Sequence, residues 1–353
     1  MNQVTLLRDT LRPYLKWHGA RLSFVAVFLI ALLRVRTVNL SELATAFSGK
    51  AQTDSHYKRL QRFFRDFEMD YAAIAHAVIA LMAIPEPWIL SLDRTEWRFG
   101  ECTFNILMLG VVHEGIAFPV LWSLLDKQGN SNSNERMTLF GQFLERFPGR
   151  EIAYLAADRE FVGQDWFYYL QAKPRTPFRI RIRENHTLYD GRHKFKARTV
   201  FQDLQPGQQR VLRHQRRLWG LWLYVAALRL DDGSLLVVAT QAAPKTAISD
   251  YAKRWGIETL FGLFKTRGFC LEATHLQDSE RLSKLLALLS LALCWAVLTG
   301  QWLHQLQPLP VKKHGRRAKS LFRYGLDHLR TVLFNLEYRQ DDFLVLLQLL
   351  SCT

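Results

Sequence analysis

Residues 251–265 read YAKRWGIETLFGLFK, and this stretch decides how the rest of the chain is interpreted. Four of its polar residues stand at offsets of 0, 3, 7 and 14, namely Tyr251, Arg254, Glu258 and Lys265. At about 100° per residue these positions fall within a stripe of about 60° on a helical wheel. The opposite arc is apolar and predicts a core-facing side made of Ile257, Leu260, Phe261 and Phe264. The stretch therefore predicts one amphipathic helix.

The polar stripe suits a metal ion held beside phosphate oxygens. Glu258 would bind the cation, while Arg254 and Lys265 would bind the phosphate. The alternative is an ordinary amphipathic helix with an Arg–Glu ion pair on its wet face, which is a common arrangement. Because the stripe is expected to face a cleft, we predict that replacing Arg254 or Lys265 leaves folding unchanged.

Two further acids follow short apolar runs. The run WILSL over residues 88–92 ends at Asp93, and the run IAYLAA over residues 152–157 ends at Asp158. Apolar runs closed by an acid are typical of buried strands that deliver a side chain to the rim of a sheet. Glu96 and Glu160 are competing acids near these positions, and Arg94 and Arg159 are expected to form structural ion pairs.

Together these motifs resemble the DDE transposases of the bacterial insertion-sequence-four family. The resemblance rests on Asp93 in SLDRT, Asp158 in ADREFVG and the Y-x2-R-x3-E-x6-K pattern of residues 251–265, and it covers about residues 88–275. It implies a catalytic and metal-binding triad of Asp93, Asp158 and Glu258. It also implies that Tyr251, Arg254 and Lys265 bind DNA. Mg²⁺ is the expected cofactor, with Mn²⁺ as an alternative.

The order of apolar runs and caps predicts an α/β fold, a ribonuclease H-like mixed sheet flanked by helices. Expected strands cover 88–93, 103–112, 118–124, the run before Asp158, and 178–182, with helices capped by Ser133 or Asn134 and over 164–172. Within the insertion, strands are expected at 200–201, 210–212, 221–230 and 235–240. The expected regions are a helical DNA-binding domain (1–85), the first part of the catalytic domain (86–182), a β-rich basic insertion before the last catalytic helix (183–243), the last catalytic part (244–303) and a basic helical C-terminal region (304–353).

Charge favours a polyanionic partner. The 353 residues carry a net charge of +15, and residues 173–217 alone hold 13 Lys and Arg against 3 acids. We therefore expect phosphates of a nucleic acid along this basic stripe. The family resemblance implies that this partner is double-stranded DNA, both the terminal inverted repeats and the target. Bringing two DNA ends together implies a homodimer in the DNA complex. Residues 55–67, a basic helix after a Gly49 turn, are compatible with a helix-turn-helix reader or with a solvated face of a bundle.

The remaining signals concern location and aromatic residues. The four scattered cysteines form no metal-ligand pair and favour a reducing cytoplasm. Residues 285–303 carry no charge but are expected to form a buried helix, with no membrane partner. The family resemblance implies an aromatic residue that stacks on a displaced base. Trp219 and Trp222 are the nearest candidates, although either could belong to the core.

The resemblance implies nicking at the ends of an element, followed by strand transfer into target DNA. Two alternatives stay open at this point. One is a related metal-dependent nuclease without strand transfer, and the other is a non-catalytic DNA-binding relative.

Overall fold

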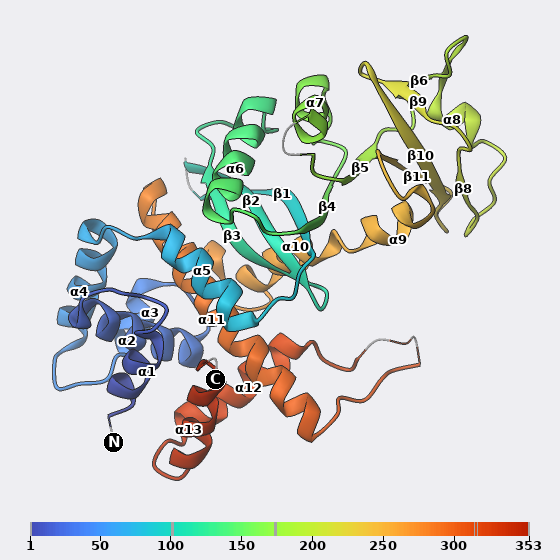
Figure 1. Cartoon of the computed structure of the whole chain (residues 1–353). Helices are drawn as coiled ribbons and strands as arrows, with labels where there is room; N and C mark the ends of the chain where they lie inside the picture. The colour runs from blue at the N-terminus through green and yellow to red at the C-terminus, as the bar shows by residue number, and fades with distance from the viewer. Residues whose placement is uncertain (1, 100–101, 173–174, 314, 316, 352–353) are drawn as a thin grey trace. The chain divides into compact units, whose positions relative to one another are not determined.

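The structure, a computed structural model, describes residues 2–99, 102–172, 175–313, 315 and 317–351. The chain forms two compact units (Figure 1). The sheet unit comprises Pro85–Glu96 and Thr103–Leu260. The helical unit comprises Met1–Ile84, Trp97–Cys102 and Phe261–Thr353.

The sheet unit is built on a mixed sheet with the strand order β3-β2-β1-β4-β5. The strands are β1 (Trp88–Phe99), β2 (Cys102–His113), β3 (Ile116–Leu124), β4 (Ile152–Ala157) and β5 (Phe178–Ile182). β2 and β3 form an antiparallel hairpin, whereas β4 pairs in parallel with both β1 and β5. This order and these directions are those of a ribonuclease H-like sheet, so the predicted fold class is confirmed.

Helices α6 (Ser133–Arg146) and α7 (Gln164–Ala172) cover the sheet with aromatic side chains. Trp88 of β1 packs edge-on against Phe143 of α6, with ring centroids 6.3 Å apart, and Phe140 meets Trp166 of α7 at 6.0 Å. The N-cap of α6 is Asn132, which precedes the two predicted caps, Ser133 and Asn134. Asn132 is favoured as the cap because it forms a reciprocal capping box with Glu135, in which each side chain accepts a hydrogen bond from the backbone amide of the other residue.

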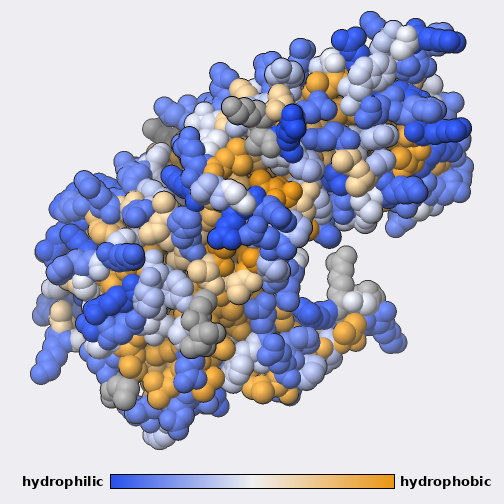
Figure 2. All heavy atoms as spheres, in the orientation of Figure 1, coloured by the Kyte–Doolittle hydropathy of each residue, from blue (hydrophilic) through white to orange (hydrophobic). Residues whose placement is uncertain are grey.

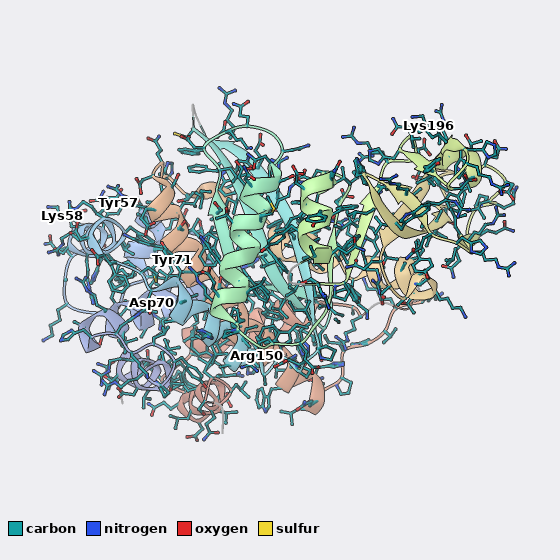
Figure 3. The ribbon with its side chains drawn as sticks, turned by 45° about the horizontal axis from the view of Figure 1, so that its top comes forward. Tyr57, Lys58, Asp70, Tyr71, Arg150 and Lys196 are labelled. Carbon is teal, nitrogen blue, oxygen red and sulfur yellow. The ribbon has the colours of Figure 1, made fainter. Side chains whose placement is uncertain are left out.

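The insertion (residues 183–243) continues the same sheet. It contains β6 (Thr187–Tyr189), β7 (Lys194–Lys196), α8 (Ala197–Val200), β8 (Gln209–Val211), β9 (Arg216–Leu218), β10 (Leu221–Arg229) and β11 (Leu235–Thr240). β11 pairs antiparallel with β5, and β10 pairs with β11, so the order runs on as β5-β11-β10-β9-β6-β7. Figure 3 shows Lys196 at the outer edge of this insertion.

Three short strands and one helix of the insertion were not predicted. Residues 200–201 were expected to be a strand, but Val200 ends α8. The expectation was wrong because a two-residue apolar step carries no period that separates helix from strand. β6, β7 and β9 have three residues each, which is too short for an alternating pattern to register.

The helical unit consists of eight α-helices among the described residues. They are α1 (Gln3–Leu11), α2 (Gly19–Val35), α3 (Leu40–Thr45), α4 (Thr53–Asp66), α5 (Tyr71–Met82), α11 (Ser279–Leu306), α12 (Leu321–Phe334) and α13 (Gln340–Gln348). Two glycines let α11 and α12 touch backbone to backbone. A side chain at Gly300 would strike the carbonyl of Leu321, and one at Gly325 would strike the carbonyl of Ala296.

Helix α11 contains the uncharged run predicted to be a buried helix, and this prediction is confirmed. By length and composition α11 could cross a membrane, but 89% of its most apolar window is buried inside the protein. Trp295 in this window donates its indole N–H to the carbonyl of Leu346 at 2.9 Å. The apolar surface of α11 is therefore covered by the other helices of this unit.

Helix α4 covers the basic helix predicted over residues 55–67, and the short helix α3 precedes it. The side chain of Asn39 caps α3 by accepting from the backbone of Ser41 at 2.9 Å. On α4, Lys58, Arg62 and Arg65 are exposed, and Figure 3 shows Lys58 on the outer surface. Arg59 instead lies 5.4 Å above the ring of Phe24. Arg65 is engaged in an ion pair with Asp66 at 2.6 Å, so Lys58 and Arg62 are the basic residues of α4 that are available to a ligand.

Candidate active site

The two aspartates of the predicted triad lie side by side at the end of two parallel strands. The pairing of β1 with β4 ends at Leu92 and Ala157, and the next residue on each strand is Asp93 or Asp158. β1 itself runs on to Phe99, beyond the end predicted at Asp93. The carboxyl ends of parallel strands share one edge of a sheet, so the register alone brings these two acids together.

The signature stretch is two helices and not the single helix predicted. α9 (Ala247–Ala252) ends before Lys253, and α10 (Trp255–Phe264) begins after Arg254. Across this break the amide of Arg254 donates to the carbonyl of Tyr251 at 2.9 Å, a tighter i to i−3 turn. The hydroxyl of Ser91 on β1 donates to the carbonyl of Arg254 at 3.4 Å. Contact with the sheet at the break thus overrides the helical period.

Arg254 is the centre of the site. Its guanidinium donates to Asp93 Oδ2 at 2.9 Å, to Glu258 Oε1 at 2.6 Å and, through Nε, to the hydroxyl of Tyr251 at 3.0 Å. The same hydroxyl donates to Asp158 Oδ1 at 3.0 Å. One cation and one phenol therefore connect all three predicted acids. Five of the six predicted site residues meet here.

Arg254 and Tyr251 at the centre of this network are buried, which argues against the alternative of an ion pair on a wet helix face. Only 4% of Arg254 and 3% of Tyr251 are exposed. Burial raises the pKa of Asp93 to about 7, a rise that Arg254 opposes and that Glu160 and Asp158 reinforce. Burial lowers the pKa of Arg254, but Tyr251 and Asp93 raise it by more, so the net shift is upward. The guanidinium stays charged while Asp93 titrates near neutrality.

Glu258 is the most accessible of the three acids. Its side chain is 36% exposed, against 14% for Asp93 and 29% for Asp158. It stands in the first turn of α10, where the helix dipole favours a negative charge. Gly256, two residues earlier, lies so close to the hairpin that an added Cβ would be 3.0 Å from Val112 Cγ1 and 3.2 Å from the amide nitrogen of Ala117. Gly256 therefore fixes how closely α10 approaches the sheet.

The sixth predicted residue, Lys265, belongs to the helical unit. Its Nζ lies 3.6 Å from Glu272 Oε1 and 5.3 Å from the ring centroid of Trp97. The structure thus gives Lys265 an ion pair and a cation–π contact within its own unit.

The competing acids Glu96 and Glu160 are tied to Arg94. Arg94 donates to Glu96 Oε2 at 2.8 Å and to Glu160 Oε1 at 3.3 Å, as expected of a structural ion pair. The same guanidinium donates to Asn105 Oδ1 at 3.0 Å. Both glutamates are thereby paired with Arg94 and not with Arg254.

The donor set has the chemistry of a divalent-cation site. Three carboxylates are hard oxygen ligands, which Mg²⁺ and Mn²⁺ prefer. Within the part of the chain that the structure describes, however, no group of three or more His, Cys, Asp or Glu side chains is arranged to hold a metal. Arg254 already joins Asp93 to Glu258, so a metal could bind all three acids only after these contacts lengthen. The three carboxylates are therefore suitable ligands for the metal, and the contacts of Arg254 with Asp93 and Glu258 are the ones that must lengthen.

Three tryptophans differ in their availability for stacking. Trp219 is packed against Phe167 and His186, with ring centroids 5.1 and 4.8 Å away, so it has a core role. Trp222 is 45% exposed on β10. Trp255, which the sequence reasoning missed, is 60% exposed at the start of α10, with the Arg254 guanidinium 5.8 Å from its ring centroid. Trp255 lies four residues after Tyr251, which places it beside the polar stripe on a helical wheel. This spacing could have identified it from the sequence.

A comparison with known protein families gives one match. The profile of the Transposase DDE domain family matches residues 85–295, which is more than half of the chain and includes all three acids. Curated proteins give no match. Among solved structures, the chain is similar to a piggyBac transposase in a cryo-EM synaptic complex with hairpin DNA. The identity is 10% and the TM-score 0.47, over 98% of this chain and 76% of that one.

Proposed function

Because the chain belongs to the Transposase DDE domain family, we propose that it is a DNA transposase of the insertion-sequence-four type. In this proposal it cleaves DNA at the ends of an insertion sequence and joins those ends to target DNA. The observation that carries the proposal is the Arg254 network, in which one guanidinium and one phenol connect Asp93, Asp158 and Glu258. An ordinary surface ion pair would be exposed, whereas this one is buried at the end of two parallel strands.

The three acids are proposed to hold two Mg²⁺ ions, with Mn²⁺ as a substitute. When bound, such ions activate the attacking hydroxyl and stabilise the leaving oxygen of the phosphodiester. Asp93 and Asp158 are fixed by strand register, and Glu258 by the close approach of Gly256 to the sheet. Rigid placement of this kind supplies the orientation on which phosphoryl transfer depends.

Arg254 has a second task in this proposal. With Asp93 and Glu258 serving as metal ligands, the fork of Arg254 would be free to donate to the oxygens of the scissile phosphate. Tyr251 keeps its hydrogen bond to Asp158 and thereby orients that carboxylate. Lys265 is proposed to bind a neighbouring phosphate in exchange for Glu272.

The proposed partner is double-stranded DNA, both the terminal repeats and the target. The net charge of +15 supports this choice, as do the exposed Lys58 and Arg62 of α4 in the proposed DNA-binding region 1–85. Two DNA ends must be held together for joining, so we propose a homodimer in the DNA complex. The proposed compartment is the cytoplasm.

The test uses purified protein, labelled terminal DNA, Mg²⁺ and a supercoiled target. We expect cleavage and joined products for the wild type. Asp93→Asn, Asp158→Asn and Glu258→Gln should each reduce cleavage by at least about 10²–10³-fold while DNA binding is retained, because an amide is a poorer ligand for a hard cation.

Each other outcome selects a different function. Cleavage without joined products would indicate a nuclease, and binding without cleavage by the wild type would indicate a non-catalytic DNA-binding protein. Full activity of any one acid variant would remove that residue from the triad.

A further inference from the structure

A cavity of about 520 Å³ in the sheet unit is lined by five arginines. They are Arg159, which follows β4; Arg181 and Arg183, at and just beyond the end of β5; Arg198 on α8; and Arg229 at the end of β10. We call this cavity the arginine pocket. Its volume lies within the range of about 300–1,000 Å³ usual for ligand sites, so it has room for more than a single phosphate group. Figure 2 shows mainly hydrophilic residues on the face that the insertion presents.

The arginine pocket has almost no internal charge compensation. Its lining contains one acid, Glu184, which forms no ion pair within 4.0 Å with a pocket arginine among the described residues. Arg181 reaches only Asp158, with Nη1 3.7 Å from Oδ1. Five like charges around one cavity repel one another, so the pocket gains stability from any anion that enters it.

Two kinds of arginine line the pocket. Arg229 is structural, because it donates to the carbonyls of Leu204 at 3.2 Å, Phe201 at 2.9 Å and Gly233 at 3.0 Å. Arg183 and Arg198 are exposed, and within the described chain their guanidiniums have neither a hydrogen bond nor an ion pair. Arg229 thus forms a fixed wall, and the exposed pair is free to bind.

Arginines nearby do find acidic partners where the fold provides them. Arg210 lies 2.6 Å from Asp203, and Arg179 lies 3.1 Å from Asp250. The lack of partners in the pocket is therefore local to the pocket and not general to this basic region. Free guanidinium forks are the groups that bind phosphate oxygens in pairs.

The pocket adjoins the proposed catalytic acids. Arg159 is the residue after Asp158, and Arg181 approaches Asp158 itself. We infer that the arginine pocket binds consecutive phosphates of one DNA strand next to the scissile bond, an assignment that rests on the proposed function. A strand is the fitting ligand because its charges recur along its length, matching arginines contributed by four separate segments.

The assignment is tested with a double variant, Arg183→Ala/Arg198→Ala, in the full-length protein. The matched control is Arg267→Ala/Arg317→Ala, which removes two exposed arginines that lie outside both the pocket and the basic stripe of residues 173–217. Affinity for fluorescein-labelled terminal DNA is measured by anisotropy in EDTA at several salt concentrations, so that catalysis plays no part. Inorganic pyrophosphate is added in a separate arm, and melting curves verify that both variants are folded.

We expect the pocket variant to lose at least about tenfold in DNA affinity and to reduce the log–log salt slope by about 1.5–2, as for two lost phosphate contacts. The control should lose less than about threefold. Equal losses in both double variants would overturn the assignment, because general charge would then explain them. A second outcome would also overturn the assignment. If pyrophosphate raises the melting temperature of the wild type but not of the pocket variant, while the two double variants bind DNA equally well, the pocket is a site for a small anion.

This outcome is separable from that of the proposed function. If the pocket variant selectively loses DNA binding but the wild type does not cleave DNA in Mg²⁺, the pocket is a DNA-binding site and the proposed transposase function is wrong. Cleavage by the wild type with unchanged binding in the pocket variant would do the reverse.

Discussion

Arg254 holds two carboxylates and a phenol with a single buried charge, so its removal should be felt in stability as well as in activity. We predict that Arg254→Ala lowers the free energy of unfolding of the metal-free protein by about 3 kcal/mol, because deleting one partner of a buried pair leaves the other uncompensated. This replaces the sequence-based expectation that folding is unchanged. Chemical denaturation in EDTA measures the loss.

Mg²⁺ supplies the control for this variant. It should stabilise Arg254→Ala more than the wild type, since it replaces the missing charge beside Asp93 and Glu258. Arg254→Lys should recover only part of the stability, because an ammonium cannot reproduce three fixed donors. Wild-type stability of the Ala variant in EDTA would contradict the central role of Arg254.

Asp93 gives the metal-free protein a pH dependence of definite sign. Its pKa is about 7 in the folded state, against an ordinary value of 3.8. Between these values the folded state retains a proton that the unfolded state has lost, so the contribution of Asp93 to stability is highest at the acidic end and declines as the pH rises from about 4 to about 7. The decline contributed by this group is at most about 4 kcal/mol.

The measurement is the unfolding free energy of wild type and Asp93→Asn across this pH range in EDTA. The difference between the two curves isolates Asp93 from other titrating groups. A wild-type curve that runs parallel to that of Asp93→Asn would show that Asp93 does not titrate in this window.

At the scale of elements, the position of α10 depends on one missing side chain. We predict that Gly256→Ala pushes α10 away from the β2–β3 hairpin, because the nearest contacts include the backbone of Ile116 and Ala117, which cannot rotate aside. Any gain of about 1 kcal/mol in helix propensity should be offset by overpacking of about 1–3 kcal/mol. The displacement of Glu258 should lower the single-turnover cleavage rate by about tenfold or more.

Gly262→Ala is the matched control in the same helix. The three atoms nearest to its new methyl group all belong to the flexible side chain of Arg267, the closest being Cδ at 3.1 Å. This variant should keep its cleavage rate and lose no stability. Equal rates for both alanine variants would show that the approach of α10 is not critical.

The elements that could be predicted from sequence are those whose signal is local. The apolar runs before Asp93 and Asp158 predicted buried strands, and strand register then placed both acids together. The break at Lys253 and Arg254 could not be predicted, because the stretch has a good helical period and the contact at the break, with Ser91 of β1, is not local in sequence. The burial of Arg254 was hidden for the same reason: its acidic partner Asp93 is 161 residues away.

At the scale of the whole molecule, charge predicts a steep salt dependence of DNA binding. Residues 173–217 hold 13 Lys and Arg, but Arg179 and Arg210 are engaged with acids, so fewer contacts than the sequence suggests are available. With about five phosphates contacted, the log–log slope in monovalent salt should be about −4 to −5. Titrations of wild type with terminal DNA between about 50 and 200 mM salt give this slope, and a value near zero would contradict the phosphate track.

The pairing of β11 with β5 has a consequence for engineering and for evolution. In the sequence the insertion looks like a separable segment. Deleting it would remove β11, the hydrogen-bonded neighbour of β5, and would leave β5 as an exposed edge strand next to β4. Exposed strand edges recruit other chains, so a shortened protein should aggregate instead of surviving as a minimal core. Transplanting the insertion between homologues would succeed only if the graft keeps Val237 opposite Ile182. The segment is thus bound to its host by register and is not freely interchangeable.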